Sequence, residues 1–174
     1  MSKKMNIKWL FFESPTREYN VREVARCIKI SPTTASSELK SLAKAGILKK
    51  KEEHHLILYR GNLESESYLD EKIFYNIRKL KESGLIEELN KFYLKPAIVL
   101  FGSASRGQDV ENSDFDLVII SENTSELPKR KEFEKKLNRQ LQLFAVRDIK
   151  DLKNKHLINN VLNGIVLQGE VKWT

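Results

Sequence analysis

The sequence has little cysteine and no long apolar run. Cys27 is the only cysteine among the 174 residues, so no disulfide can form within the chain. The longest uninterrupted apolar run covers residues 97–101, far short of the ~20 residues that a membrane-spanning helix needs. The apolar patch near the N-terminus is too short for a signal peptide. We therefore expect a cytoplasmic protein with no membrane partner.

The sequence has fewer acidic than basic residues, and the excess of basic residues lies in its first third. The chain has 31 Lys and Arg against 24 Asp and Glu, a net charge of +7. Residues 1–60 alone hold 13 basic and 6 acidic residues, which is also +7, so the rest of the chain is neutral overall. A basic N-terminal part favours a polyanionic partner, although a solvated surface would have the same composition.

The first third of the sequence predicts a helix-turn-helix. Asn20 followed by Glu23 has the spacing of a capping box before a helix over residues 21–29. Ser31-Pro32 predicts the start of a second helix, which ends at Gly46. Small hydroxyls and lysines lie on the outer face of this second helix, and such side chains suit insertion into a DNA major groove and contact with phosphates.

The next residues predict two strands around a polar tip, over residues 47–51 and 56–60. Residues 5–60 thereby resemble the winged-helix domains of archaeal and bacterial transcription regulators. The resemblance implies binding to double-stranded DNA, and a purely structural or protein-binding winged helix stays open. The residues expected at DNA are Thr33, Thr34, Ser36, Ser37, Lys40, Lys44, Lys50 and Lys51.

Three segments follow from this pattern, and together they predict an α+β protein. Residues 1–62 form the winged helix-turn-helix, residues 63–95 a helical connector, and residues 96–174 a domain with a mixed β-sheet flanked by helices. The connector contains a long helix over residues 64–83, whose apolar stripe fits a core, a linker or the surface of a homodimer.

Two acidic residues interrupt a buried strand. Asp114 and Asp116 stand two apart at the start of the apolar run that ends at residue 120, so their side chains share one face, with Cα atoms about 6.5 Å apart. Gly102 and Ser103 follow another buried strand, where glycine lets backbone N–H groups approach a phosphate and a short helix begins. Paired carboxylates beside a phosphate-binding turn suit Mg²⁺, which prefers oxygen ligands and bridges to phosphates.

Gly102, Ser103, Asp114 and Asp116 make the pattern Gly-Ser, ten residues, Asp-x-Asp. This pattern resembles the DNA polymerase β-type nucleotidyltransferases, most closely the minimal ones, and a winged helix in front of such a domain is an archaeal arrangement. Nucleotide-binding positions that also match the family are Arg106, Gly107 and Ser113. The resemblance implies an NTP as substrate, with ATP the one expected, Mg²⁺ as cofactor, and transfer of a nucleoside monophosphate to a protein or nucleic-acid hydroxyl.

One position departs from that family. The resemblance implies a third carboxylate on the next strand, where this sequence has Gln142, which carries no charge and is a poor base. Three functions therefore stay open. They are an active nucleotidyltransferase with Asp114 and Asp116 as catalytic metal ligands, a DNA-binding regulator that senses nucleotide with weak or no transfer, and an antitoxin-like module with a small helical toxin-like partner.

Overall fold

The computed structural model describes residues 6–172, and the chain divides into two compact units, residues 1–75 and residues 76–174. The boundary lies inside helix α4 (Glu66–Glu82), between Tyr75 and Asn76. Both units combine helices with sheets, so the α+β class predicted from the sequence is confirmed. Each unit is described by itself below.

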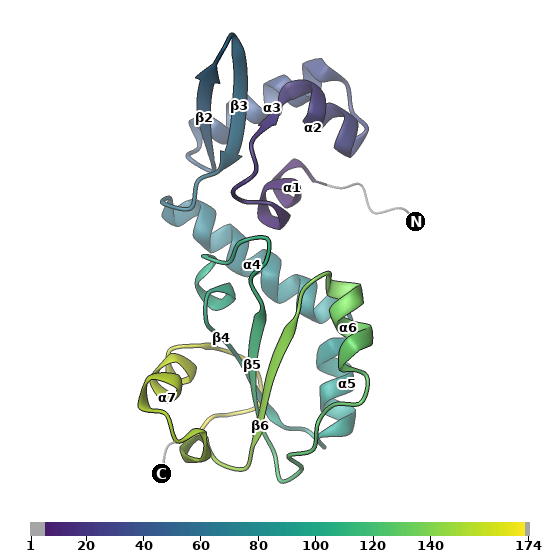
Figure 1. The fold of residues 1–174 in the computed structure, drawn as a ribbon, viewed down its shortest axis with the longest axis vertical. Coiled ribbons are helices and arrows are strands. Elements are labelled where there is room, and N and C mark those ends of the chain that lie inside the picture. Colours follow the sequence, from purple (N-terminus) through teal and green to yellow (C-terminus); the bar gives the residue numbers. More distant parts are fainter. Residues whose placement is uncertain (1–5, 173–174) are drawn as a thin grey trace. The chain divides into compact units, whose positions relative to one another are not determined.

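The first unit contains three short helices and a small antiparallel sheet. The helices are α1 (Ile7–Glu13), α2 (Val21–Ile28) and α3 (Pro32–Lys44), followed by the start of α4. The strands are β1 (Tyr19–Asn20), β2 (Leu48–Glu53) and β3 (Leu56–Gly61), in the order β1-β3-β2. Figure 1 shows β2 and β3 as a long hairpin.

The helices of this unit begin where the sequence predicts. The Asn20 side chain accepts a hydrogen bond from the Glu23 N–H at 3.0 Å, and the Glu23 carboxylate accepts one from the Asn20 N–H at 2.8 Å, which completes the capping box. Ser31 caps α3 by accepting from the Thr34 N–H at 3.0 Å. Gly46 has φ 75°, the left-handed conformation expected just after a helix end.

The second unit is built on one four-stranded mixed sheet. Its strands are β4 (Ala97–Phe101), β5 (Phe115–Ile120), β6 (Leu141–Val146) and β7 (Ile165–Gln168), in the order β6-β5-β4-β7. β5 and β6 are parallel, and the other neighbours are antiparallel. Its helices are the end of α4, α5 (Leu85–Phe92), α6 (Arg130–Leu137) and α7 (Lys155–Leu162), with 3₁₀ turns η1 (Ala104–Arg106) and η2 (Ile149–Leu152).

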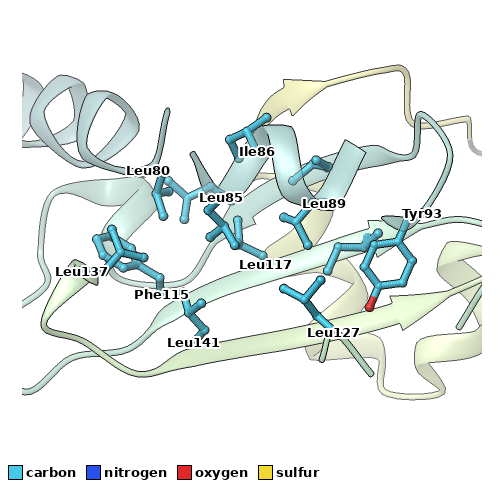
Figure 2. Packing of buried hydrophobic residues seen from close by; sticks show 14 residues of the cluster. Leu80, Leu85, Ile86, Leu89, Tyr93, Phe115, Leu117, Leu127, Leu137 and Leu141 are labelled. Atoms are coloured by element: carbon cyan, nitrogen blue, oxygen red, sulfur yellow. The ribbon is translucent and has the colours of Figure 1, made fainter. Parts of the chain in front are cut away.

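Alternation along β5 decides which side chains reach which layer. Figure 1 shows α5 and α6 on one side of the sheet and α7 on the other. Leu117 belongs to the cluster with Leu85 and Leu89 of α5, and Figure 2 shows these three side chains packed together. Val118 belongs to the second cluster, with Val161 of α7. Even-numbered residues of β5 therefore point to the α7 side of the sheet.

Two short elements have no counterpart among the elements predicted above from the sequence. One is the 3₁₀ turn η2, which the Asp148 side chain caps by accepting from the Lys150 N–H at 2.8 Å. The two-residue strand β1 was not predicted, because two residues are too few to show an alternating pattern. Within residues 6–172, no helix is both long and apolar enough to cross a membrane.

Candidate nucleotide and metal site

The turn after β4 brings the backbone against an acidic side chain. Gly102 has φ 74°, and a Cβ placed on it would collide with the Asp116 Oδ2 atom, so only glycine fits here. The chain then forms one 3₁₀ turn, η1, in place of the short helix expected. Among the described residues, the backbone N–H groups of Ser103 and Ala104 find no acceptor. Two such N–H groups in succession form a concave site for an anion.

The two carboxylates lie at the start of β5, beside this turn. Asp114 directly precedes the strand, and Asp116 is the partner of Phe101 in the antiparallel register with β4. Both side chains are partly buried. Burial raises the pKa of Asp116 above its usual value, and the like charge of Asp114 raises that pKa further. A cation bound beside Asp114 and Asp116 would offset the cost of ionising Asp116.

Gln142 completes the group from the neighbouring strand. It is the parallel-register partner of Asp116, and its Nε2 donates a hydrogen bond to the Asp114 Oδ2 at 2.7 Å. The side chain therefore lies where the sequence places the third member of the site. An amide nitrogen in this position supplies a donor to a carboxylate and no negative charge.

The donor set fits a divalent cation that binds together with its substrate. Among residues 6–172, no cluster of three or more His, Cys, Asp or Glu side chains could hold a metal alone. Mg²⁺ commonly uses only one or two protein carboxylates and takes its other ligands from phosphates and water. Asp114 and Asp116 supply two carboxylates next to the free N–H groups of the Gly102 turn, so the residues fit Mg²⁺ carried by a triphosphate.

The remaining predicted nucleotide residues shape the loop between β4 and β5. Ser113 is a structural residue there, because its Oγ accepts from the Val110 N–H at 2.9 Å. Gly107 is buried with φ 66° and ends the η1 turn. Arg106 is exposed, and its Nε donates to the Gln108 Oε1 at 3.3 Å. Arg106 is thus the one cation of this loop that is free to reach a ligand from solvent.

A buried polar network, which was not predicted from the sequence, holds this loop in place. Asp109 is fully buried and accepts from Arg139 Nη1 at 2.6 Å and from Asn76 Nδ2 at 2.8 Å. Asn76 also donates to the Ala104 carbonyl at 3.0 Å, and Arg139 to the Ser113 carbonyl at 3.4 Å. The network therefore fixes both ends of the loop, next to the Gly102 turn and next to Asp114.

An open hollow of about 520 Å³ lies beside Asp114. Its walls come from the end of the β4–β5 loop and from the exposed lysines Lys131 and Lys135 of α6, with Glu111 and Glu134 between them. The hollow gives a second molecule access to the carboxylate of Asp114 from solvent.

The residues predicted at DNA lie together in the first unit. Seven of them are exposed, and Ser36 is partly buried: Thr33, Thr34, Ser36, Ser37, Lys40, Lys44, Lys50 and Lys51. Two of these side chains already have partners within the chain. The Thr34 hydroxyl lies 2.8 Å from the Ser31 Oγ, and Lys51 forms an ion pair with Glu53 at 2.7 Å. The other side chains present a polar, cationic face on α3 and β2.

Comparison with known proteins finds a sequence similarity within the second unit. Residues 82–166 match the family model described as "Nucleotidyltransferase domain", a range that includes Gly102, Asp114, Asp116 and Gln142. No curated protein matches the chain. A solved chain titled "Crystal structure of the toxin-antitoxin with AMP-PNP" is 25% identical, over 51% of this chain and 73% of that one, with a TM-score of 0.39. Residues 82–166 are similar in sequence to nucleotidyltransferase domains, and this supports nucleotidyl transfer as the class of chemistry.

Proposed function

We propose that the second unit binds a nucleoside triphosphate together with Mg²⁺ and transfers a nucleoside monophosphate to a protein or nucleic-acid hydroxyl. The observation that carries this proposal is the meeting of Asp114, Asp116 and the Gly102 turn at one edge of the sheet. A domain built only for stability gains nothing from two adjacent carboxylates, one of which has a raised pKa.

Each residue has a role in binding. The N–H groups of Ser103 and Ala104 would bind phosphate oxygens, and Arg106 would reach the triphosphate from the rim of the loop. Asp114 and Asp116 would hold Mg²⁺, which when bound neutralises charge on the phosphates and orients them for in-line displacement. The acceptor hydroxyl would enter through the hollow beside Asp114.

Gln142 predicts that transfer is slow. The position beside Asp114 and Asp116 lacks the third negative charge that would raise metal affinity, and an amide cannot take a proton from the acceptor. Loss of general-base assistance costs a factor of about a hundred to ten thousand in rate. The protein would therefore bind nucleotide well and transfer it poorly.

The test is transfer of label from ATP labelled at the α-phosphate, in the presence of Mg²⁺ and candidate protein and RNA acceptors. We expect weak labelling with the parent protein, more with Gln142→Asp, and none above background with Asp116→Asn. Strong transfer by the parent that is unchanged in Gln142→Ala would show that the third acid is dispensable. No labelling by the parent or by Gln142→Asp with any acceptor would favour nucleotide binding without turnover.

A second function, DNA binding by the first unit, is supported by a separate observation. We infer that α3 enters the major groove and that the β2–β3 hairpin contacts the backbone, as in a winged helix. Supporting this, Lys40 and Lys44 are exposed one turn apart on α3, and Lys50 is exposed on β2. Together the two units would make a regulator whose DNA binding responds to nucleotide.

The test of this second function is a fluorescence titration with duplex DNA at increasing salt. We expect affinity to fall steeply with salt, because contacts to phosphates release counterions. If the protein binds no duplex at low salt, the first unit has another role.

A further inference from the structure

The outer edge of the second unit's sheet has unpaired backbone groups. β6 is the last strand in the order β6-β5-β4-β7, and among the described strands it pairs only with β5. Figure 1 shows it as the outermost strand beside β5. The run from Leu141 to Val146 contains neither a charged residue nor a proline, the usual features that keep an edge strand from pairing with another chain.

The direction of each backbone group along β6 follows from two hydrogen bonds. The carbonyl of Gln140 accepts from the Phe115 N–H, and the carbonyl of Val146 accepts from the Ser121 N–H. In a parallel pair, the N–H and C=O of one residue point to the same side, and successive residues alternate. The even-numbered residues of β6 therefore point to β5, and the odd-numbered residues Leu141, Leu143 and Ala145 point outward.

One of these outward groups is already satisfied. The Leu141 N–H donates to the Glu134 Oε1 of α6 at 3.1 Å. Among residues 6–172, no group bonds the outward N–H and C=O of Leu143 or Ala145. The strand ends at Val146, so these two residues make up the free edge.

The free edge lies in a hollow with a partly apolar lining, which also includes Glu126, Arg130 and Asp151. A space of about 410 Å³ is lined by residues 143–146 and by side chains from both faces of the sheet, including Leu127 on one side and Leu157 on the other. An extended strand that occupied this space would gain backbone hydrogen bonds and apolar burial at once.

We propose that a second copy of this chain occupies the edge, through antiparallel pairing of β6 with β6 about a twofold axis. One register uses every free group. With Leu143 opposite Ala145 of the other copy, both residues exchange N–H···O=C bonds in both directions, which gives four bonds across the axis. A shift of two residues in one direction would place Leu141 opposite Ala145, and the Leu141 N–H is already bonded to Glu134. A shift in the other direction would place Leu143 opposite Arg147, which lies beyond the end of the strand.

Side chains and charge are compatible with this register. Phe144 lies on the axis opposite its own copy, in the closely spaced non-hydrogen-bonded pair, where aromatic residues pair favourably. Gln140 would face Asp148 of the other copy, and no like charges are opposed. Residues 76–174 hold 17 basic and 14 acidic residues, a net charge of only +3, so repulsion between two copies of this unit is weak.

The first test is the mass of the full chain by sedimentation velocity over a wide concentration range. We expect a monomer–dimer equilibrium in the parent and a monomer in Ala145→Pro, because proline removes an outward N–H and leaves the bonds to β5 intact. Ala145→Ser keeps the N–H and should still dimerise. A parent that is monomeric at every concentration, or an Ala145→Pro that dimerises as the parent does, overturns the proposal.

The second test fixes the register by cross-linking. In a Cys27→Ser background, Phe144→Cys would place two Cα atoms about 4.5 Å apart across the axis, within the range of a disulfide. Mild oxidation should give a covalent dimer, and adding Ala145→Pro should abolish it. Val166→Cys, on the other edge strand β7, is the matched control and should not cross-link. A covalent dimer from Val166→Cys and none from Phe144→Cys would assign the contact to β7 and contradict the proposal.

Discussion

Asp114 and Gln142 illustrate how one uncharged side chain would change the proposed metal site. The amide nitrogen of Gln142 donates to the Asp114 Oδ2, so the carboxylate keeps a hydrogen-bond partner when no ion is bound. A cation that binds Asp114 would break or rearrange this hydrogen bond, and Gln142 offers it no negatively charged ligand. The site is therefore weaker for metal than one with a third acid.

We expect Gln142→Asp to raise Mg²⁺ affinity by about tenfold, because it adds a third carboxylate beside two partly buried ones. Isothermal titration of Mg²⁺ in the presence of ATP measures this change. Gln142→Ala removes the amide without adding charge and is the control. Equal affinities in Gln142→Asp and Gln142→Ala would show that the third position does not contact the ion.

Asp116 gives a prediction on stability. Its pKa is raised by burial and by Asp114, so the folded chain binds this proton more tightly than the unfolded chain does. Without metal, the unfolding free energy should fall as pH rises from the unfolded pKa, about 3.9, through the higher folded pKa. Above both, the ionised carboxylate is unfavourable.

Asp116→Asn should therefore stabilise the metal-free protein at neutral pH by about 0.5–1 kcal/mol, a small gain because the group is only partly buried. The gain should vanish below about pH 3.9. Urea denaturation followed by circular dichroism at both pH values checks it, with the exposed Glu132→Gln as control. A stabilisation that is the same at both pH values would argue against the electrostatic cause.

The positions of single residues can be predicted from the sequence where the pattern is local, and not where it depends on distant segments. The Gly-Ser turn and the paired acids are visible because each acts within a few residues in the sequence. Asn76, Asp109 and Arg139 are 30 or more residues apart, and nothing in the local pattern shows that they meet. The loop between the two buried strands also contains the charged residues Arg106 and Glu111, so the charge of Asp109 does not single it out.

At the scale of elements, the β4–β5 loop depends on that network. Arg139→Met would leave the fully buried Asp109 without its ion-pair partner, and breaking a buried pair in this way costs about 3–5 kcal/mol. Hydrogen exchange of the β5 amides measures the unfolding free energy of this unit. Adding Asp109→Asn removes the uncompensated charge and should recover part of the loss.

Measuring nucleotide binding distinguishes two roles of the network. It can hold the β4–β5 loop in position for the ligand, or it can only stabilise the unit. The double variant should still bind ATP and Mg²⁺ more weakly than the parent, because neither new side chain holds the Ser113 carbonyl in place. If Arg139→Met alone lowers the unfolding free energy by less than about 1 kcal/mol, the ion pair of Arg139 with Asp109 contributes little to stability.

The elements with strong capping or alternation were predicted closely, and the irregular ones were not. α2 and α3 begin at predicted caps, β4 is a continuous apolar run, and β5 is apolar except for Asp116. The strand order and the parallel pairing of β5 with β6 depend on contacts between distant segments, so no local pattern contains them. η1 and η2 are single 3₁₀ turns, too short to have a period of their own.

At the scale of the whole molecule, charge is distributed unevenly along the chain. All the net positive charge arises in residues 1–60, whereas the candidate nucleotide site lies in a nearly neutral part. This division predicts two separable activities, with strong salt dependence for DNA binding alone.

We expect Lys40→Ala and Lys44→Ala each to weaken binding to duplex DNA and to reduce the slope of log affinity against log salt by about one. Fluorescence anisotropy at several salt concentrations measures both quantities. Lys155→Ala, an exposed lysine of the second unit, should change neither. If Lys155→Ala has the same effect as the α3 variants, the DNA contact is non-specific and does not belong to α3.

The most direct test of the central claim is the affinity of the protein for ATP with Mg²⁺ and with a chelator in its place. Asp114 and Asp116 would hold the ion that carries the triphosphate, so binding should be at least about tenfold weaker in chelator, equivalent to about 1.4 kcal/mol. The difference should disappear in Asp114→Asn and in Asp116→Asn. Equal affinity of the parent protein for ATP with and without Mg²⁺ would contradict the assignment of this site.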